Sequence, residues 1–442
     1  MNAVPGVEVL EARDAEGRQR RVAGALRRAG VGPGDRVVFC LPASAPLLCA
    51  VLGAARCGVV PVLLNTTLLR AERDLLVADA EPAAVVEDAV ALDAWGEGPE
   101  SELAPFPLVR PMHYTSGTTG RPKGVWSGLF DDEADLWEFD AADTHLVCSP
   151  LYHSVSVRLA AAALLRGGRV VILERFDPVA ALSALEQYAP TTTFMAPTVL
   201  GRVLEAAGGA RAPFGSLRRL VHAGSPCPPP LKRAALGSVG PEVLWEFYGS
   251  TEGQFTVCPP GEWRARPGTV GRARPGRRLE VGPDGVVWCH APAFARFSYW
   301  RDPKSTAQAW RGDAFTVGDL GRLDHDGYLF LDGRRDDLVI SGGVNVYPVE
   351  VETVLSEAPG VDAVAVFGIA DEDWGQRVCA AVVGDADEAA LRRHAAARLA
   401  PYKRPKDYVF VAELPHTATG KLRRRALAEE LGPGLAGGGG AG

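Results

Sequence analysis

The sequence predicts an α/β protein with a large N-terminal domain, built from doubly wound parallel sheets and a small β subdomain, and a small α+β C-terminal domain. Over residues 1–258, short β-rich runs alternate with helical runs, which is typical of parallel strands joined by crossover helices. Over residues 259–335, glycine, proline and aspartate punctuate short strands, which indicates a mostly antiparallel subdomain. Residues 336–431 then read as a separate unit of mixed helices and strands.

The strands of the N-terminal domain are expected in short apolar runs between helical segments. Pro178–Tyr188 and Pro197–Ala207 are two of these helical segments, and each has proline in its first turn, where a helix tolerates it. Runs flanked by helices on both sides predict parallel strands that are buried on both faces. The expected strands are Arg36–Leu41, Val59–Leu63, Ala84–Glu87, His145–Ser149, Arg169–Leu173, Thr191–Ala196, Arg218–Ala223 and Val243–Tyr248.

The later units are predicted from similar patterns. In the β subdomain, Gly285–Trp288 and Gly327–Leu331 are expected to be strands. In the C-terminal domain we expect a helix from Pro348, a second helix over residues 388–399, and the strands Ala363–Phe367, Val378–Val383 and Asp407–Val411. The Gly/Ala-rich tail, residues 432–442, has too little apolar area to fold and is expected to be disordered.

The composition of the 442 residues fits a protein with a large buried core. Hydrophobic residues make up 47% and charged residues 23%, and the net charge of −7 argues against a nucleic-acid binder or a basic membrane-surface protein. The eight cysteines form no CxxC pair, so free thiols are expected. The apolar stretch Ala45–Leu64 contains Arg56 and Pro61 and is expected to be helix, turn and buried strand. With no basic leader at Met1–Leu10, we expect a soluble, cytoplasmic protein.

The most specific motif is the segment Tyr114–Val125, which reads YTSGTTGRPKGV. Its glycines allow backbone N–H groups to turn inward, its hydroxyl groups add hydrogen-bond donors, and its lysine supplies a mobile positive charge for phosphate oxygens. The spacing does not match the GxxxxGK(S/T) loop of kinases and ATPases. We therefore predict another type of polyphosphate-binding loop, formed by Thr115, Ser116, Gly117, Thr118, Thr119, Gly120 and Lys123.

A second motif, YGSTE at residues 248–252, follows a predicted strand at the carboxyl edge of the sheet, where α/β proteins bind their ligands. Gly249 is expected to form the turn, and Tyr248 to stack on a purine base. Thr251 is expected to hydrogen-bond a phosphate, and Glu252 to hold Mg²⁺ through its carboxylate oxygens.

A third motif pairs an aspartate with an arginine further along the chain. Asp319 follows Gly318, and a carboxylate beside a glycine can accept hydrogen bonds from both hydroxyl groups of a ribose. Arg334 has the reach to span ribose and phosphate. The two residues therefore predict a ribose site.

Taken in order along the chain, these motifs closely resemble those of the AMP-forming acyl-adenylate superfamily, which comprises acyl- and aryl-CoA ligases, nonribosomal-peptide adenylation domains and firefly luciferase. The resemblance covers nearly the whole chain and is strongest to aryl-CoA ligases of the benzoate and 4-chlorobenzoate type. It implies the use of ATP, Mg²⁺ and coenzyme A, and it places Gly224 and Ser225 in the loop that packs on the adenine. At Val317 the chain departs from the family's Thr-Gly-Asp pattern, which removes one hydroxyl near the nucleotide.

The resemblance also implies a mobile C-terminal domain that carries a catalytic lysine. Lys421, in the segment PHTATGK, is at the family's lysine position. A cation is needed there because the attack of a carboxylate on the α-phosphate brings two anions together. Asp336 is at the hinge position, and Gly342 and Gly343 are in the loop that replaces the lysine loop in the second half-reaction.

Two further sites are implied by the resemblance. Trp374, Tyr402 and Arg404 resemble residues that receive the CoA nucleotide, through aromatic faces and a cation. His153 resembles the histidine that gates the carboxylate site, and it joins Thr251, Glu252 and Lys421 as a candidate catalytic residue. An aromatic or other compact acid is expected in a pocket formed by Tyr152, His153, Ser156, Met195 and Phe255, with further walls from Phe194, Ala196 and Gln254. Ser156 stands where many CoA ligases have glycine.

The sequence thus predicts an ATP-dependent carboxylate:CoA ligase that forms an acyl-adenylate and pyrophosphate, and then a thioester. Two alternatives share the same nucleotide motifs: a stand-alone adenylation enzyme that loads a carrier protein, and an enzyme that adenylates a non-standard acid such as nitrite. A third is a catalytically silent nucleotide-binding protein, against which the joint presence of Lys123, Glu252 and Lys421 argues. Neither nucleic acid nor membrane is expected as a partner, and the expected assembly is a monomer or a homodimer.

Overall fold

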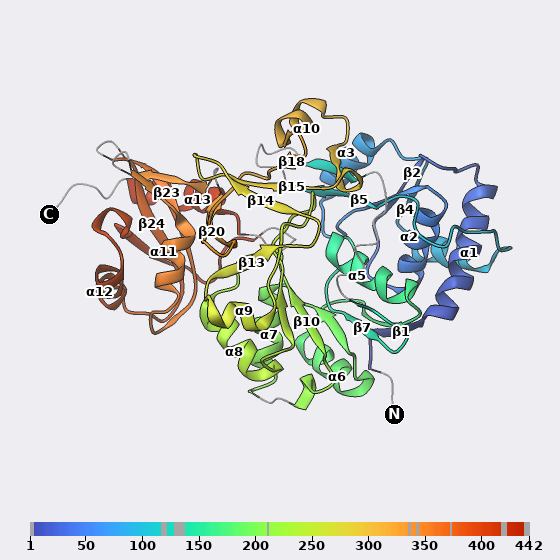
Figure 1. Cartoon of the computed structure of the whole chain (residues 1–442), viewed down its shortest axis with the longest axis horizontal. Helices are drawn as coiled ribbons and strands as arrows, with labels where there is room; N and C mark the ends of the chain where they lie inside the picture. Colours follow the sequence, from blue (N-terminus) through green and yellow to red (C-terminus); the bar gives the residue numbers. More distant parts are fainter. Residues whose placement is uncertain are drawn as a thin grey trace.

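The protein consists of a large N-terminal part and a smaller C-terminal part. The computed structural model describes residues 4–115, 122–127, 138–209, 212–334, 337–341, 344–371, 374–416 and 422–436. Figure 1 shows the blue to yellow elements, from β1 to β20, as the larger part, with the orange and red elements, from β21 to α13, beside it. In the described part of the chain, no helix is both long and apolar enough to cross a membrane.

The first sheet of the large part has six strands in the order β16-β6-β5-β3-β2-β4. Strands β2 to β5 run parallel to one another, whereas β6 and β16 are antiparallel to their neighbours. The strands are β2 (Arg36–Phe39), β3 (Val60–Leu63), β4 (Ala84–Val86), β5 (Met112–Thr115), β6 (Lys123–Ser127) and β16 (Phe297–Tyr299). Because β16 comes from the β subdomain, that subdomain is fixed to the edge of this sheet.

The second sheet has six strands in the order β1-β8-β7-β9-β10-β11. All are parallel except β1, an antiparallel strand at the edge. The strands are β1 (Val7–Glu11), β7 (Thr144–Val147), β8 (Arg169–Leu173), β9 (Thr192–Phe194), β10 (Arg219–His222) and β11 (Leu244–Glu246). The carboxyl ends of β7, β9, β10 and β11 therefore lie along one edge.

Helices cover both faces of each sheet, so the predicted doubly wound fold is confirmed. Three helices share one apolar core with strands of both sheets and so lie between them: α1 (Ala12–Arg28), α2 (Ala45–Arg56) and α5 (Ser154–Leu165). The other face of the second sheet is covered by α6 (Pro178–Tyr188), α7 (Pro197–Ala206) and α8 (Pro229–Val239). The other face of the first sheet is covered by α3 (Arg70–Ala80), and α4 (Ala89–Glu97) packs beside α1 and α2.

The β subdomain contains two four-stranded antiparallel sheets, with the orders β12-β13-β20-β19 and β14-β15-β18-β17. Aromatic rings of Phe255, Phe297 and Phe315 form its core, with centroid distances of 4.8 Å and 5.5 Å around Phe315. Its elements are β12 (Thr256–Val257), α9 (Pro260–Ala265), β13 (Thr269–Ala273), β14 (Arg278–Val281), β15 (Val287–His290), α10 (Pro303–Ala309), β17 (Trp310–Arg311), β18 (Ala314–Phe315), β19 (Asp319–Leu323) and β20 (Tyr328–Arg334).

In its described residues, the C-terminal part is a five-stranded sheet with three α-helices. Its order is β22-β21-β24-β23, and β25 pairs in parallel with β24. Its elements are β21 (Val339–Ser341), β22 (Val344–Val346), α11 (Pro348–Leu355), β23 (Val361–Asp371), β24 (Gly375–Gly384), α12 (Glu388–Arg398), β25 (Asp407–Phe410) and α13 (Arg424–Ala436).

Helix α13 corrects one expectation and ties three segments together. Residues 432–436, expected to be disordered, are helical. The reason is that Leu431 and Leu435 pack on the apolar face of β23 and β24. This packing buries apolar area and stabilises the helix, although the Gly/Ala-rich composition of the tail predicted too little apolar area to fold. At the other end of the helix, the Arg424 guanidinium lies 2.9 Å from Asp337 Oδ2 and 2.7 Å from Glu352 Oε2.

The other expectations about elements agree with the structure. Every strand expected over residues 1–258 is present, with its ends within two residues of those predicted. Three later strands, β20, β23 and β24, are present but extend three or four residues beyond the expected bounds at one end. The stretch Ala45–Leu64 forms helix α2, a turn and strand β3, and all eight cysteines are free. The strands β1, β5 and β6 were not predicted; β5 and β6 flank the glycine-rich motif, whose polar residues conceal them.

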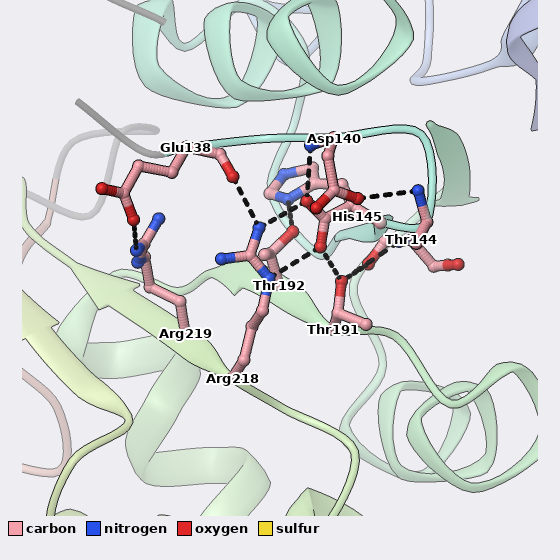
Figure 2. A network of polar contacts seen from close by, with 10 residues as sticks. Glu138, Asp140, Thr144, His145, Thr191, Thr192, Arg218 and Arg219 are labelled. Atoms are coloured by element: carbon pink, nitrogen blue, oxygen red, sulfur yellow. Dashed lines mark hydrogen bonds and ion pairs between the residues drawn. The ribbon is translucent and has the colours of Figure 1, made fainter. Parts of the chain in front are cut away.

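A polar network joins the amino ends of β7, β9 and β10, far from the predicted site (Figure 2). Asp143 accepts hydrogen bonds from the Arg218 guanidinium and, at 2.6 Å, from Thr191 Oγ1. Although burial acts to raise it, these hydrogen bonds hold the pKa of Asp143 below its usual value. Burial lowers the pKa of His145 to about 3, so its ring is neutral where Nδ1 meets Thr192 Oγ1 at 2.9 Å. We assign this network to holding the strands in register.

Candidate active site

The motif after β11 forms a tight turn that presents two of the predicted catalytic side chains. The backbone N–H of Ser250 donates to the carbonyl oxygen of Gly253 at 2.9 Å. A Cβ atom at Gly249 would lie 2.8 Å from that same oxygen, so this position requires glycine. Thr251 and Glu252 occupy the middle of the turn, at the carboxyl edge of the second sheet.

Tyr248, Asp319 and Arg334 are brought together. Tyr248 Oη donates to Asp319 Oδ2 at 2.5 Å, and Arg334 Nε lies 3.2 Å from Asp319 Oδ1. Asp319 and Arg334 face one another across β19 and β20. Burial and the charge of Asp319 raise the pKa of Tyr248 well above its usual value, so the phenol keeps the proton that it donates. The three residues expected around the nucleoside therefore form one hydrogen-bonded group.

Tyr299, which sequence reasoning missed, connects Lys123 with Glu252. Tyr299 Oη donates to Glu252 Oε1 at 2.9 Å, and Lys123 Nζ lies 5.0 Å from the centre of the Tyr299 ring. Lys123 Nζ also donates to Ser305 Oγ at 2.9 Å. Tyr299 thus contacts both the ammonium group that we expect to bind a phosphate and the carboxylate that we expect to bind Mg²⁺. No motif in the sequence identifies Tyr299, because it comes near Lys123 only when β16 pairs with the distant strand β6.

Only the two ends of the predicted phosphate loop are described. Thr115 and Lys123 are partners on β5 and β6, and Thr115 Oγ1 donates to the Lys123 carbonyl oxygen at 3.5 Å. The loop therefore starts and ends at one point of the sheet, beside Tyr299. The predicted residues that lie outside the described ranges are Ser116, Gly117, Thr118, Thr119, Gly120, Asp336, Gly342, Gly343 and Lys421.

The loop after β10 carries the predicted adenine-binding residues Gly224 and Ser225. Gly224 has a φ of +94°, in the left-handed region, and a Cβ atom there would meet nothing within 4 Å. The backbone conformation, and not lack of space, therefore favours glycine at this position. The exposed backbone leaves room for a flat ligand to pack against it.

A buried charged cluster lies where β10 and β11 end. Lys232 of α8 is 1% exposed, and its Nζ donates to Glu246 Oε2 at 2.8 Å and contacts His222 Nε2. His222 and Glu246 are neighbours across the two strands. Burial, with the charge of Lys232, lowers the pKa of His222 well below its usual value, so a neutral ring accepts from the ammonium group. The cluster fixes the strand ends from which the loops of Gly224 and Tyr248 leave.

A cavity of about 90 Å³ lies beside the turn that carries Thr251 and Glu252, and both residues line it. Most of its wall is apolar and comes from α2, α5 and the chain before β5. The polar residues of the wall include His113, Arg158, Gln254 and Arg277. An acid bound here would place its carboxyl group next to the candidate metal ligand.

Of the residues predicted to form the acid pocket, Gln254 lines this cavity and the others do not. Met195 and Phe255 are fully buried: Met195 belongs to the core outside the second sheet, and Phe255 packs under Tyr248 with ring centroids 4.7 Å apart. Ser156 is buried on the side of α5 that does not face the cavity, and neither Tyr152 nor His153 is in the lining. Apart from Gln254, the cavity is therefore lined by side chains other than those predicted.

The two aromatic residues predicted to bind CoA lie on the surface of the C-terminal part. Trp374 is 40% exposed and Tyr402 is 38% exposed. Lys406 Nζ lies 3.3 Å from the centroid of the Trp374 ring, and Lys403 Nζ lies 5.7 Å from that of Tyr402. Exposed aromatic faces with nearby cations suit a nucleotide.

Arg404, the cation predicted to join them, is engaged elsewhere. Its Nε donates to the Leu399 carbonyl oxygen at 2.9 Å and its Nη2 to the Ala396 carbonyl oxygen at 3.0 Å, at the end of α12. Arginine commonly satisfies carbonyl groups at a helix C-terminus in this way. Lys403 is engaged too, since its Nζ donates to Glu350 Oε1 at 2.5 Å and to Glu350 Oε2 at 2.7 Å. Lys406, beside Trp374, is therefore better placed than Arg404 to meet a phosphate.

Glu252 fits the Mg²⁺ that the family implies. Within the described ranges, no group of three His, Cys, Asp or Glu side chains is able to hold a metal ion by itself. Mg²⁺ needs no such group, since it binds through one or two carboxylates together with substrate phosphates and water. There it would neutralise charge on the leaving pyrophosphate.

Asp319→Asn is expected to raise the KM for ATP by about 10-fold, because a neutral amide replaces a charged acceptor of hydrogen bonds from the ribose. Initial rates of pyrophosphate release at varied ATP concentration measure this effect. Asp326→Asn is the matched control, since Asp326 is exposed in the turn after β19 and pairs with Arg266. An unchanged KM in Asp319→Asn contradicts the assignment of Asp319 to the ribose.

Comparisons with known proteins agree with this geometry. Residues 8–105 and 109–286 match the family described as AMP-binding enzyme, and residues 350–421 match the AMP-binding enzyme C-terminal domain. The long-chain-fatty-acid–CoA ligase FadD13 of Mycobacterium tuberculosis is 30% identical over 93% of this chain and 91% of its own length. The indoleacetate–CoA ligase of Aromatoleum aromaticum is 32% identical over 91% of this chain and 90% of its own length.

A solved structure extends the similarity to three dimensions. The ATP-bound structure of MatB from Rhodopseudomonas palustris superposes with a TM-score of 0.85 at 30% identity, and covers 94% of this chain and 92% of that one. The similarity thus spans both parts of the molecule. The chain belongs to the family of AMP-binding enzymes, as its motifs led us to expect.

Proposed function

We propose that this AMP-binding enzyme is an ATP-dependent carboxylate:CoA ligase. One observation carries the proposal: Lys123 and Glu252 meet on Tyr299, and Glu252 is also part of the wall of the apolar cavity. A phosphate-binding cation, a metal-binding carboxylate and a pocket for an acid therefore adjoin one another. The names of the relatives, which are CoA ligases, support the same reaction.

In the first half-reaction an oxygen of the substrate carboxylate attacks the α-phosphorus of ATP, and the bond to pyrophosphate breaks. Lys123 and Lys421 offset the negative charge that builds up on the phosphate oxygens. In the second half-reaction the sulfur of CoA attacks the acyl carbon, AMP leaves, and a thioester forms. The exposed surface around Trp374 and Tyr402 is the proposed contact for the CoA nucleotide.

The proposed acid is aromatic or otherwise compact. The cavity walls are mostly apolar, and apolar walls with a few polar groups suit a compact ring. The two relatives act, by their names, on a long-chain fatty acid and on indoleacetate. We propose an acid of the second kind.

A screen for pyrophosphate release tests the proposed function. With Mg²⁺ and ATP, aromatic acids are expected to release pyrophosphate faster than short aliphatic or fatty acids, and free CoA is expected to yield the matching thioester. Mass spectrometry of the products identifies the thioester. Pyrophosphate release without a thioester, until a carrier protein bearing phosphopantetheine is added, would instead support the carrier-loading alternative. No release with any acid would leave a nucleotide-binding protein without ligase activity.

A further inference from the structure

His113 lies on β5 and lines the cavity, although sequence reasoning did not single it out. Successive residues of a strand point to opposite faces, and Met112 packs with the core cluster of α3. His113 therefore faces the opposite side, toward α5. Its side chain is 7% exposed.

One ring nitrogen of His113 is fixed as a donor. His113 Nδ1 lies 3.0 Å from the carbonyl oxygen of Tyr152, just before α5. A carbonyl oxygen only accepts hydrogen bonds, so Nδ1 carries the proton in this contact. Burial lowers the pKa of His113 to about 4, so the ring is neutral near pH 7 and Nε2 carries a lone pair. Among the described residues Nε2 has no hydrogen-bond partner, and it is the ring nitrogen left for the cavity.

Gln254, at the turn after β11, carries a hydrogen-bond donor, whereas His113 carries an acceptor. Arg274 Nη1 donates to Gln254 Oε1 at 2.7 Å, which identifies the oxygen of that amide and leaves Nε2 as a donor. Gln254 is 3% exposed and lines the cavity, and its Nε2 has no acceptor among the described residues. A carboxylate accepts hydrogen bonds and cannot donate them, so it suits the arginine side chains that also line the cavity, Arg110, Arg158 and Arg277, and not His113.

We propose that the acid activated here carries a hydrogen-bond donor, a hydroxyl or N–H group, in addition to its reacting carboxyl group, and that His113 Nε2 accepts from this donor. The inference rests on the proposed function, because it names the class of acid that the same site takes. An acid without the donor gives this nitrogen of the cavity wall no hydrogen bond from the ligand, which is the source of the discrimination. Hydroxylated or amino-substituted arenecarboxylates and indole acids belong to this class.

Matched pairs of acids test the proposal. Benzoate is compared with its hydroxy, amino and methoxy derivatives at each ring position, and indole-3-acetate with its N-methyl derivative. For wild-type protein, kcat/KM for pyrophosphate release is expected to be about 10-fold higher for the best donor-bearing acid than for its methylated partner. His113→Phe is expected to bring this ratio to about 1, whereas His113→Gln, which presents an acceptor oxygen, retains part of it.

Controls separate this effect from a general defect. Ser127→Ala changes another residue of the cavity wall and is expected to keep the wild-type ratio, and the KM for ATP is expected to stay unchanged in all three variants. A wild-type ratio near 1, or a ratio that survives in His113→Phe, overturns the proposal. Calorimetric titration of the same acids into the protein measures binding without turnover.

The two measurements distinguish the failure of this inference from that of the proposed function. If donor-bearing acids bind with a preference that depends on His113 but release no pyrophosphate, the inference stands and the ligase function fails. If pyrophosphate is released without a donor preference, the ligase stands and the inference fails. If no acid binds and none is turned over, both fail.

Discussion

Lys421→Ala is expected to lower the rate of adenylate formation by about 10²–10³-fold, since it removes a cation from a transition state that gathers negative charge. Thioester formation from a supplied acyl-adenylate is expected to remain near the wild-type rate, because that step involves no attack on phosphorus. Pyrophosphate release measures the first half-reaction, and release of AMP after CoA is added to synthetic acyl-adenylate measures the second.

Two further variants, a control and a hinge variant, help to interpret this result. Arg425→Ala removes an exposed charge four residues from Lys421 and is expected to leave both half-reactions unchanged. Asp336→Pro restricts the backbone at the proposed hinge and is expected to slow the second half-reaction more than the first. Equal losses of both half-reactions in Lys421→Ala contradict the role assigned to the lysine.

Lys232→Met is expected to lower the free energy of unfolding by about 3–5 kcal/mol, which is the cost of leaving a buried charge without its partner. The carboxylate concerned is Glu246, whose Oε2 lies 2.8 Å from Lys232 Nζ in a site closed to solvent. Urea denaturation followed by circular dichroism measures the change. The loops of Gly224 and Tyr248 leave from the same strand ends, so weaker ATP binding is expected to accompany the loss of stability.

The neighbouring residue provides the control for this variant. Arg233 follows Lys232 on α8, is exposed and pairs with Glu357 at 3.5 Å, so Arg233→Ala is expected to change stability by less than about 0.5 kcal/mol. The double variant Lys232→Met/Glu246→Gln removes both charges and is expected to be more stable than Lys232→Met alone. A double variant no more stable than the single one contradicts the pairing as the cause.

The sequence was sufficient for elements whose pattern is local. Strand β8 was predicted with its observed bounds, because an apolar run between two helical segments has few other interpretations. Residues 432–436 of the tail were misjudged because their helix depends on a distant surface, the apolar face of β23 and β24. Residues 437–442 lie outside the described ranges. Strand β6 was missed because it is stabilised by pairing with β5 and β16, and its own residues show no strand pattern.

The same distinction holds for the candidate site. Tyr248 and Asp319 were predicted from short motifs, and the structure joins them although they are 71 residues apart. Tyr299, Lys232 and His113 belong to no motif, and their positions follow from strand pairing and helix packing. The cavity wall was the least predictable part, because most of it comes from α2, α5 and the chain before β5, which only the fold brings together.

The two ion pairs of Arg424 have a mechanical consequence for a ligase with a turning domain. Asp337 directly follows the proposed pivot, and Arg424 stands three positions after Lys421. One guanidinium joins Asp337 to Glu352 on α11, so the start of α13 is braced against the residue next to the pivot. A rotation at the proposed hinge, Asp336, is therefore expected to turn the start of α13, three residues after Lys421, through the same angle.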